Sequence, residues 1–153
     1  MAMSDFFSSQ SSNDSRNTFP SSIYIFAFNI DSIRFAFDSL KQDGYVQRSI
    51  EMCMKHGIPA SKIIVYVLFN FNDNLKSALY RAKEISKLGA RPYAMEYIPL
   101  NATEIHSYYY GYWNRELCRD FSFFINKLKF ANAMPFELWQ SKWKKFRYYK
   151  EKL

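Results

Sequence analysis

An apolar run from Ile63 to Phe69 stands between Lys62 and Asn70. It shows no alternation of polar and apolar residues, which predicts a strand covered on both faces, as parallel strands usually are. A second strand-like run, Arg91–Ile98, stops before Pro99, because proline has no N–H to offer a sheet. The stretch Lys62–Leu100 is therefore predicted to form a strand, a helix and a second strand.

The segment between these two runs has the period of an amphipathic helix. Its apolar stripe is predicted to comprise Leu75, Ala78, Leu79, Ala82, Ile85 and Leu88. The residues expected to face solvent are Lys76, Arg81, Lys83, Glu84 and Lys87. Asp73 or Asn74 can cap the start of this helix by accepting hydrogen bonds from its free N–H groups, and Gly89 ends it.

A similar unit precedes this one. In the run Ile33–Phe37, Ile33, Phe35 and Phe37 share one face of a strand. The segment Tyr45–His56 then has helical spacing, with an inner face of Val46, Ile50, Cys53 and Met54; Met52 and Met54 are interpreted as packing residues. Strands starting near Ile33, Lys62 and Arg91 recur about every thirty residues, the size of one βαβ unit, so we expect an α/β fold with a parallel sheet and right-handed crossovers.

The flanking segments complete a division into three parts. Residues 1–22 are rich in Ser and Asn and are predicted to be a disordered tail, residues 23–130 an α/β domain, and residues 131–153 a basic, aromatic helix. Within the domain, Ile23–Phe28 is strand-like and forms either a hairpin or one interrupted strand with Ile33–Phe37. Asn114 is expected to cap a helix whose inner face is Leu117, Phe121, Phe124, Ile125 and Leu128. A last helix, Phe136–Lys150, is predicted to carry an aromatic stripe for packing or docking, formed by Phe136, Trp139, Trp143 and Phe146.

Composition narrows the function classes. The net charge of +7 admits nucleic-acid binding, but much of the excess lies near the C-terminus, where a basic helix is commonly a solvated face, so nucleic acid is the weaker choice of partner. The two cysteines, Cys53 and Cys118, lack CxxC spacing and suggest neither a metal site nor a disulfide framework. No apolar run has the length of about 20 residues that a membrane span needs, and no signal peptide is recognised, so the expectation is no membrane association and a cytoplasmic location.

Candidate ligand-binding residues lie where the predicted strands end, because ligands of parallel α/β folds bind beyond the carboxyl ends of the strands. Asp38 and Ser39 follow the first strand, and they could instead start a turn. Asn70 ends the buried run, where its amide needs a partner; Asn72 and Asp73 come next, and Asp73 is also a candidate helix cap. Glu96, Tyr97 and Asn101 lie near the end of the third strand, and Glu96 could face solvent if that strand is at an edge. The carboxylates, amides and hydroxyls of these residues suit a polar ligand such as a nucleoside.

Several blocks of the chain resemble the C-terminal half of a radical S-adenosylmethionine protein. They are Arg34–Ser39, Lys62–Asp73, Ala78–Ala82, Leu88–Met95 and Pro99–Asn101. The resemblance covers roughly residues 33–128. These blocks are similar to members of the family whose later barrel strands carry "VYVLxNF" and "LGxRPYxM" patterns.

This resemblance implies a partial (β/α)6 barrel, of which the chain holds the last three βα units together with additional C-terminal helices. It also implies a cofactor, S-adenosylmethionine, with Asp38 and Ser39 near its ribose or methionine part, Asn70 near the ribose, and Met95, Glu96 and Tyr97 near the adenine. The chain departs from the family in lacking the CxxxCxxC motif, so the [4Fe-4S] cluster would be bound only in a full-length protein.

Two hypotheses follow. The first is the C-terminal portion of a radical S-adenosylmethionine enzyme of unknown substrate, inactive without a cluster-binding half, which would be its partner. The alternative is a non-catalytic α/β binding module that contacts protein or nucleic acid through its aromatic, basic C-terminus. A half-barrel would also leave an unpaired sheet edge at Ile33–Phe37 or at the hairpin before it, so the isolated chain is expected to self-associate.

Overall fold

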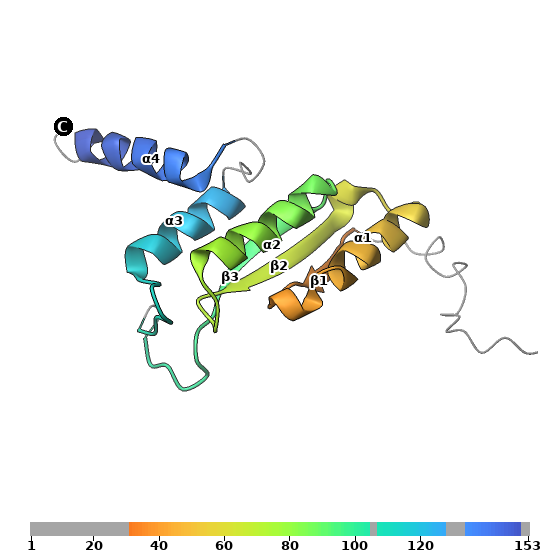
Figure 1. The fold of residues 1–153 in the computed structure, drawn as a ribbon, viewed down its shortest axis with the longest axis horizontal. Helices are drawn as coiled ribbons and strands as arrows, with labels where there is room; N and C mark the ends of the chain where they lie inside the picture. Colours follow the sequence, from red (N-terminus) through yellow and green to blue (C-terminus); the bar gives the residue numbers. More distant parts are fainter. Residues whose placement is uncertain (1–30, 105–106, 128–133, 151–153) are drawn as a thin grey trace, which may run out of the picture.

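The computed structural model describes residues 31–104, 107–127 and 134–150. These ranges contain three strands and four α-helices in the order β1, α1, β2, α2, β3, α3, α4, and two 3-10 turns, η1 (Leu40–Gln42) and η2 (Ala60–Lys62) (Figure 1). The predicted tail of residues 1–22 and the strand-like run Ile23–Phe28 lie outside the described residues.

The three strands form one parallel sheet in the order in which they occur in the chain. β1 (Ile33–Ala36) pairs with β2 (Ile63–Phe69), which pairs with β3 (Arg91–Glu96). The register places Phe35 beside Val65, and Val67 beside Ala94. The predicted α/β fold with a parallel sheet is therefore confirmed.

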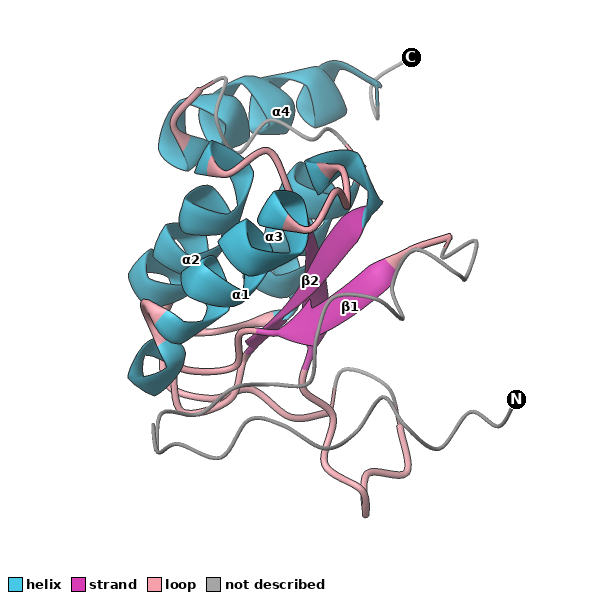
Figure 2. Cartoon of the chain, turned by 90° about the vertical axis from the view of Figure 1, so that its right-hand side faces the viewer, coloured by secondary structure: helices cyan, strands magenta, loops and turns pink. Residues whose placement is uncertain are grey.

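Helices α1 (Tyr45–Lys55) and α2 (Leu75–Lys87) lie on the same face of this sheet (Figure 2). On that face the β2 side chains Ile63, Val65, Val67 and Phe69 are fully buried. The prediction that β2 is covered on both faces is wrong for the described part of the chain, because the alternate residues Ile64, Tyr66 and Leu68 remain partly exposed. A strand packed under helices on one side buries only every second side chain.

We call the second face of the sheet the open face, since none of the described helices covers it. The strand register assigns to it Arg34, Ala36, Ile64, Tyr66, Leu68, Arg91, Tyr93 and Met95. Tyr93 is 46% exposed and Met95 is 43% exposed. The Tyr66 and Tyr93 rings meet edge to face across this surface with their centroids 5.6 Å apart.

The inner faces of α1 and α2 largely follow the predicted stripes. In α1, Val46 and Ile50 are buried and Cys53 packs against the core, whereas Met52 and Met54 are 53% and 42% exposed, so their prediction as packing residues is wrong. In α2, Ala78, Ala82 and Ile85 are buried with Leu75, Leu79 and Leu88 packed beside them, and Asn74 is the N-cap, its side chain accepting from the Ser77 N–H.

Helix α3 (Arg115–Asn126) borders the outer edge of β3. The side-chain amide of Asn126 accepts a hydrogen bond from the Ala94 N–H at 2.7 Å and donates one to the Ala94 carbonyl at 2.9 Å. These backbone groups would otherwise lie unpaired at the sheet edge. The edge formed by β3 is thus partly closed by a side chain of α3.

Helix α4 (Phe136–Lys150) packs on α3 through aromatic side chains. Phe136 and Trp139 are buried, and Phe123 of α3 stacks on Trp143 with the ring centroids 5.0 Å apart. The stripe predicted at Phe136, Trp139 and Trp143 is thus used for packing within the chain. The predicted inner residue Leu128 and the side chain of Phe146 lie outside the described part.

Candidate functional site

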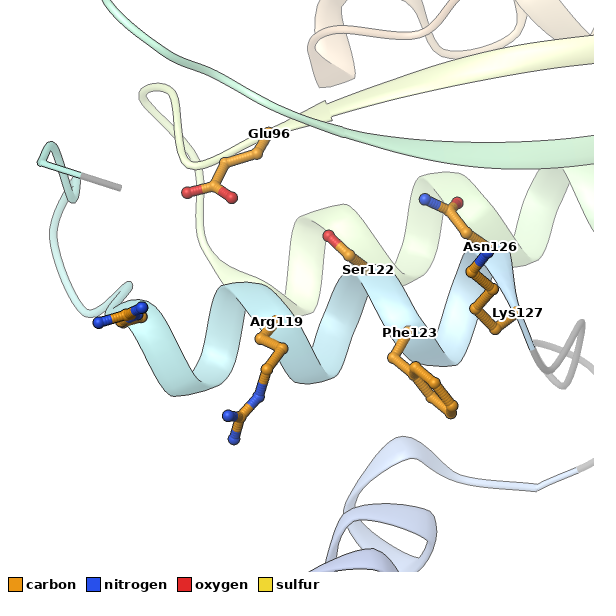
Figure 3. Close-up of a pocket in the computed structure, with 7 residues that line it drawn as sticks. Glu96, Arg119, Ser122, Phe123, Asn126 and Lys127 are labelled. Atoms are coloured by element: carbon orange, nitrogen blue, oxygen red, sulfur yellow. The ribbon is translucent and has the colours of Figure 1, made fainter. Parts of the chain in front are cut away.

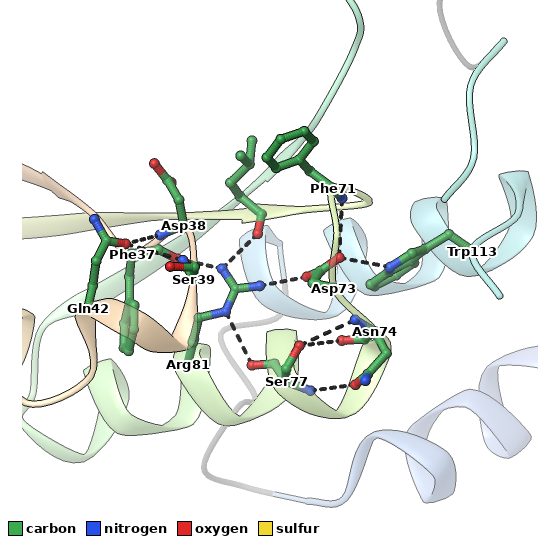
Figure 4. Close-up of polar contacts among 11 residues, drawn as sticks. Phe37, Asp38, Ser39, Gln42, Phe71, Asp73, Asn74, Ser77, Arg81 and Trp113 are labelled. Carbon is green, nitrogen blue, oxygen red and sulfur yellow. Dashed lines mark hydrogen bonds and ion pairs between the residues drawn. The ribbon is translucent and has the colours of Figure 1, made fainter. Parts of the chain in front are cut away.

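The carboxyl ends of β1 and β2 are joined by a buried arginine that extends from α2 (Figure 4). The Arg81 guanidinium donates through Nη1 to the Phe37 carbonyl at 2.5 Å and to the Leu68 carbonyl at 2.8 Å. Its Nη2 lies 2.6 Å from Oδ2 of Asp73. Arg81 was predicted to face solvent, and this prediction is wrong: the side chain is buried because these three acceptors converge beneath the strand ends.

Asp73 links the same cluster to the segment that precedes α3. Its Oδ1 accepts hydrogen bonds from the Phe71 N–H at 3.2 Å and from the Trp113 indole N–H at 3.0 Å. Asn74, rather than Asp73, provides the helix cap. The carboxylate of Asp73 therefore fixes the β2–α2 turn and the Trp113 side chain at once.

Burial and charge have opposite effects on the pKa values of Asp73 and Arg81. Burial raises the pKa of the Asp73 carboxyl, and the positive charge of Arg81 offsets part of that rise. Burial lowers the pKa of the Arg81 guanidinium, while the nearby carboxylates of Asp73 and Asp38 favour its charged form. An arginine starts from so high a pKa that it stays charged near neutral pH, so the cluster holds an ion pair.

Asn70 is fully buried at the end of β2, in a left-handed conformation with φ of 65°. Its side-chain Nδ2 donates to the Tyr108 carbonyl at 2.9 Å, and its Oδ1 accepts from the Tyr110 N–H at 2.8 Å. The partner that the sequence required for this amide is therefore the backbone of the loop before α3. Asn72 adds a second link, since its Oδ1 accepts from the Tyr110 hydroxyl at 2.8 Å.

Asp38 and Ser39 begin a turn, which is one of the two alternatives that the sequence offered for them, the other being ligand binding. Both of their N–H groups donate to Oε1 of Gln42, at 2.6 Å and 3.2 Å. The Asp38 side chain is partly exposed and that of Ser39 is exposed. Asp38 continues the alternation of Arg34 and Ala36, which places it at the rim of the open face.

Met95, Glu96 and Tyr97 do not share one surface. Met95 belongs to the open face, whereas Glu96 pairs in register with Phe69 and lies on the opposite face, toward α3. Tyr97 extends the sheet by donating its N–H to the Phe69 carbonyl at 2.9 Å. Its ring contacts those of Phe71 and Tyr108, with centroids 4.4 Å and 5.7 Å away.

On its own side of the sheet, Glu96 is near Cys118 of α3. Burial, followed by the charge of Glu96 and a hydrogen bond to it, raises the pKa of the Cys118 thiol to about 12. The thiol is fully buried and stays protonated at neutral pH. Cys118 therefore behaves as a core residue and does not suit an iron–sulfur cluster, whose ligands are thiolates.

The six predicted site residues thus divide among four places. Asp38, Met95 and Tyr97 border the open face or its rim, Glu96 lies on the other side of the sheet, and Asn70 is bonded to the loop. Ser39 is in the exposed turn. Arg81 and Trp113 were not among the predicted site residues. For Arg81 the sequence offers one signal of burial, a cation close to Ala78 and Ala82 of the predicted apolar stripe.

A scan against protein-family models, a search of curated proteins and a search of solved structures each found no match for the chain. In the described ranges, no group of three or more His, Cys, Asp or Glu residues is arranged to hold a metal ion. None of the helices described has both the length and the apolar character needed to cross a membrane.

Proposed function

We propose that this chain is the C-terminal portion of a radical S-adenosylmethionine enzyme and contributes three βα units to a partial (β/α)6 barrel. The observation that carries the proposal is the open face. Strands in sequential parallel order with helices on one side are the arrangement of a barrel wall, whose other side faces the interior. A second half of such a barrel would cover Tyr66, Tyr93 and Met95, which are partly exposed here.

The rim of this face has groups that suit S-adenosylmethionine. Asp38 offers a carboxylate for ribose hydroxyls or for the methionine amino group, and the backbone from Met95 to Tyr97 borders the place proposed for the adenine. Tyr97 and Met95 provide apolar surface next to it. Asn70 takes a supporting role in this account, because its amide holds the Tyr108–Tyr110 loop at the rim.

The chemistry of the family requires a reduced cluster, which this chain does not ligate. The family motif uses three thiolates, and this chain has two cysteines, of which Cys118 is buried and protonated. The chain is therefore proposed to bind and orient the nucleoside while a cluster-binding half supplies the electron. The substrate of the whole enzyme stays open.

Equilibrium dialysis of labelled S-adenosylmethionine tests this proposal. We expect weak, saturable binding to the wild-type chain and its loss in Met95→Lys, which puts a positive charge on the open face, where it repels a ligand that is itself a cation. Met54→Lys is the matched control, since Met54 is 42% exposed on α1 and Met95 is 43% exposed on β3. Absence of binding, or equal loss in both variants, would contradict the proposal.

A further inference from the structure

A pocket of about 450 Å³ lies beside α3, on the side of the sheet away from the open face (Figure 3). Its lining includes Glu96 at the end of β3, the α3 residues Arg115, Arg119, Ser122 and Phe123, and Lys127, which follows the last residue of α3. This volume is within the range of small-molecule sites, roughly 300–1,000 Å³. Successive β3 residues point to opposite faces, so Glu96 and Met95 serve different surfaces.

The pocket has an excess of positive charge. Three of its residues are cations and one is a carboxylate. Arg115 and Lys127 make no ion pair with another described residue, and the one recorded for Arg119, to Asp120, has a long separation of 3.8 Å. Asp120 is itself buried and accepts a hydrogen bond from Gln140. The cationic side chains are thus available to an anion that enters the pocket.

The order of these residues along α3 also matters. Arg115, Arg119, Phe123 and Lys127 follow one another at intervals of four residues, about one helical turn. Figure 3 shows Arg119, Phe123 and Lys127 projecting from one side of the helix. Two guanidinium groups one turn apart can engage a single phosphate, whose oxygens match their planar donors.

Phe123 places an aromatic ring next to this pair of arginines. The ring is held by stacking on Trp139 and Trp143, with interplanar angles of 21° and 22°. It is partly exposed, so some of its surface is available to a ligand. A planar base or other flat apolar group stacks favourably on such a ring.

From this arrangement we propose that the pocket beside α3 binds a nucleotide, with its phosphate on Arg115 and Arg119 and its base against Phe123. Lys127 lies twelve residues beyond Arg115, about 18 Å along the helix axis, and meets the far end of a ligand or a second phosphate. The site is independent of the one proposed for S-adenosylmethionine.

Titration calorimetry of the full chain with adenosine 5′-monophosphate, adenosine and pyrophosphate tests the site. The expected result is binding of the monophosphate, with affinity reduced about tenfold or more in Arg115→Gln/Arg119→Gln, since each lost contact is a charge-assisted hydrogen bond. Adenosine should bind more weakly than the monophosphate, because it lacks the phosphate. Pyrophosphate should also bind more weakly, because it lacks the base.

A control variant separates a specific site from general charge. Lys76→Gln/Lys83→Gln also removes two positive charges, but from exposed positions of α2. It should leave the affinity for the monophosphate within about twofold of the wild-type value. Circular dichroism and thermal melting show whether each variant is folded. The proposal is overturned if the monophosphate does not bind, if adenosine binds equally well, or if both double variants lose affinity equally.

Discussion

The guanidinium of Arg81 lies 2.6 Å from the carboxylate of Asp73, and the two side chains are only 1% and 7% exposed. The ion pair joins α2 to the turn after β2, and the same arginine donates to the carbonyl of Phe37, just after β1, and to that of Leu68, near the end of β2. The rim of the open face is therefore positioned by a polar cluster beneath it.

Replacing Arg81 with Met should cost about 3–5 kcal/mol of unfolding free energy, because Asp73 is then left as a buried, unpaired charge. Chemical denaturation followed by circular dichroism measures the loss. Lys83→Met, at an exposed position of the same helix, is the control and should stay within about 0.5 kcal/mol of the wild type. A loss of similar size in both variants would refute a structural role for the ion pair.

Asn70→Gly should release the loop before α3 while leaving the strand intact. Glycine tolerates the φ of 65° at this position, so the substitution removes the amide without adding backbone strain. Hydrogen exchange at the Tyr110 amide should become faster, since that N–H loses its acceptor. Asn72→Gly, also at positive φ, removes only the acceptor of the Tyr110 hydroxyl and should leave this exchange rate nearly unchanged.

The thiol of Cys118 gives a pH dependence with a defined sign. Its folded-state pKa of about 12 lies above its ordinary value of 9.0, so between these pH values the unfolded chain ionises while the folded chain keeps its proton. Stability from this group is present below pH 9 and declines as pH rises toward 12, by up to about 1.4 kcal/mol per pH unit. Denaturation across this range should show a steeper decline for the wild type than for Cys118→Ala, and parallel curves would contradict it.

Besides the sheet edge at Ile33–Phe37 that the sequence predicts to mediate self-association, the exposed side chains of the open face are expected to contribute to it. Met95→Lys puts a charge on this face and should lower the apparent mass in sedimentation at high protein concentration. Met54→Lys adds the same charge to α1 and should sediment like the wild type. A wild-type chain that is monomeric at all concentrations would argue against an exposed barrel wall.

Local patterns in the sequence predicted much of the fold. The apolar period of α2, the cap residues Asn74 and Asn114, and the spacing of the strands each depend on neighbouring residues, and the structure agrees with them. What the sequence could not supply were contacts between distant segments. The acceptors that bury Arg81 come from the residue after β1, from β2 and from the turn that follows β2, and the loop that binds Asn70 lies 38–40 residues away.

The lack of information on contacts between distant segments also explains why the predicted site residues lie on different surfaces. Met95 and Glu96 are adjacent in the sequence, but strand geometry sends them to opposite faces of the sheet. Helical periodicity likewise placed Met54 with the inner residues of α1, although the sheet contacts a narrower stripe that ends at Cys53. Which side of an element is covered depends on what packs against it, and that information is not local.

The most direct test of the barrel-wall account is methyl NMR of the chain labelled at its methionines. Met95 reports on the open face, and the similarly exposed Met52 and Met54 report on α1 in the same sample. Titration with S-adenosylmethionine should shift the Met95 methyl signal in a saturable manner and leave those of Met52 and Met54 in place. An unchanged Met95 signal, or equal shifts at all three methionines, would contradict the account.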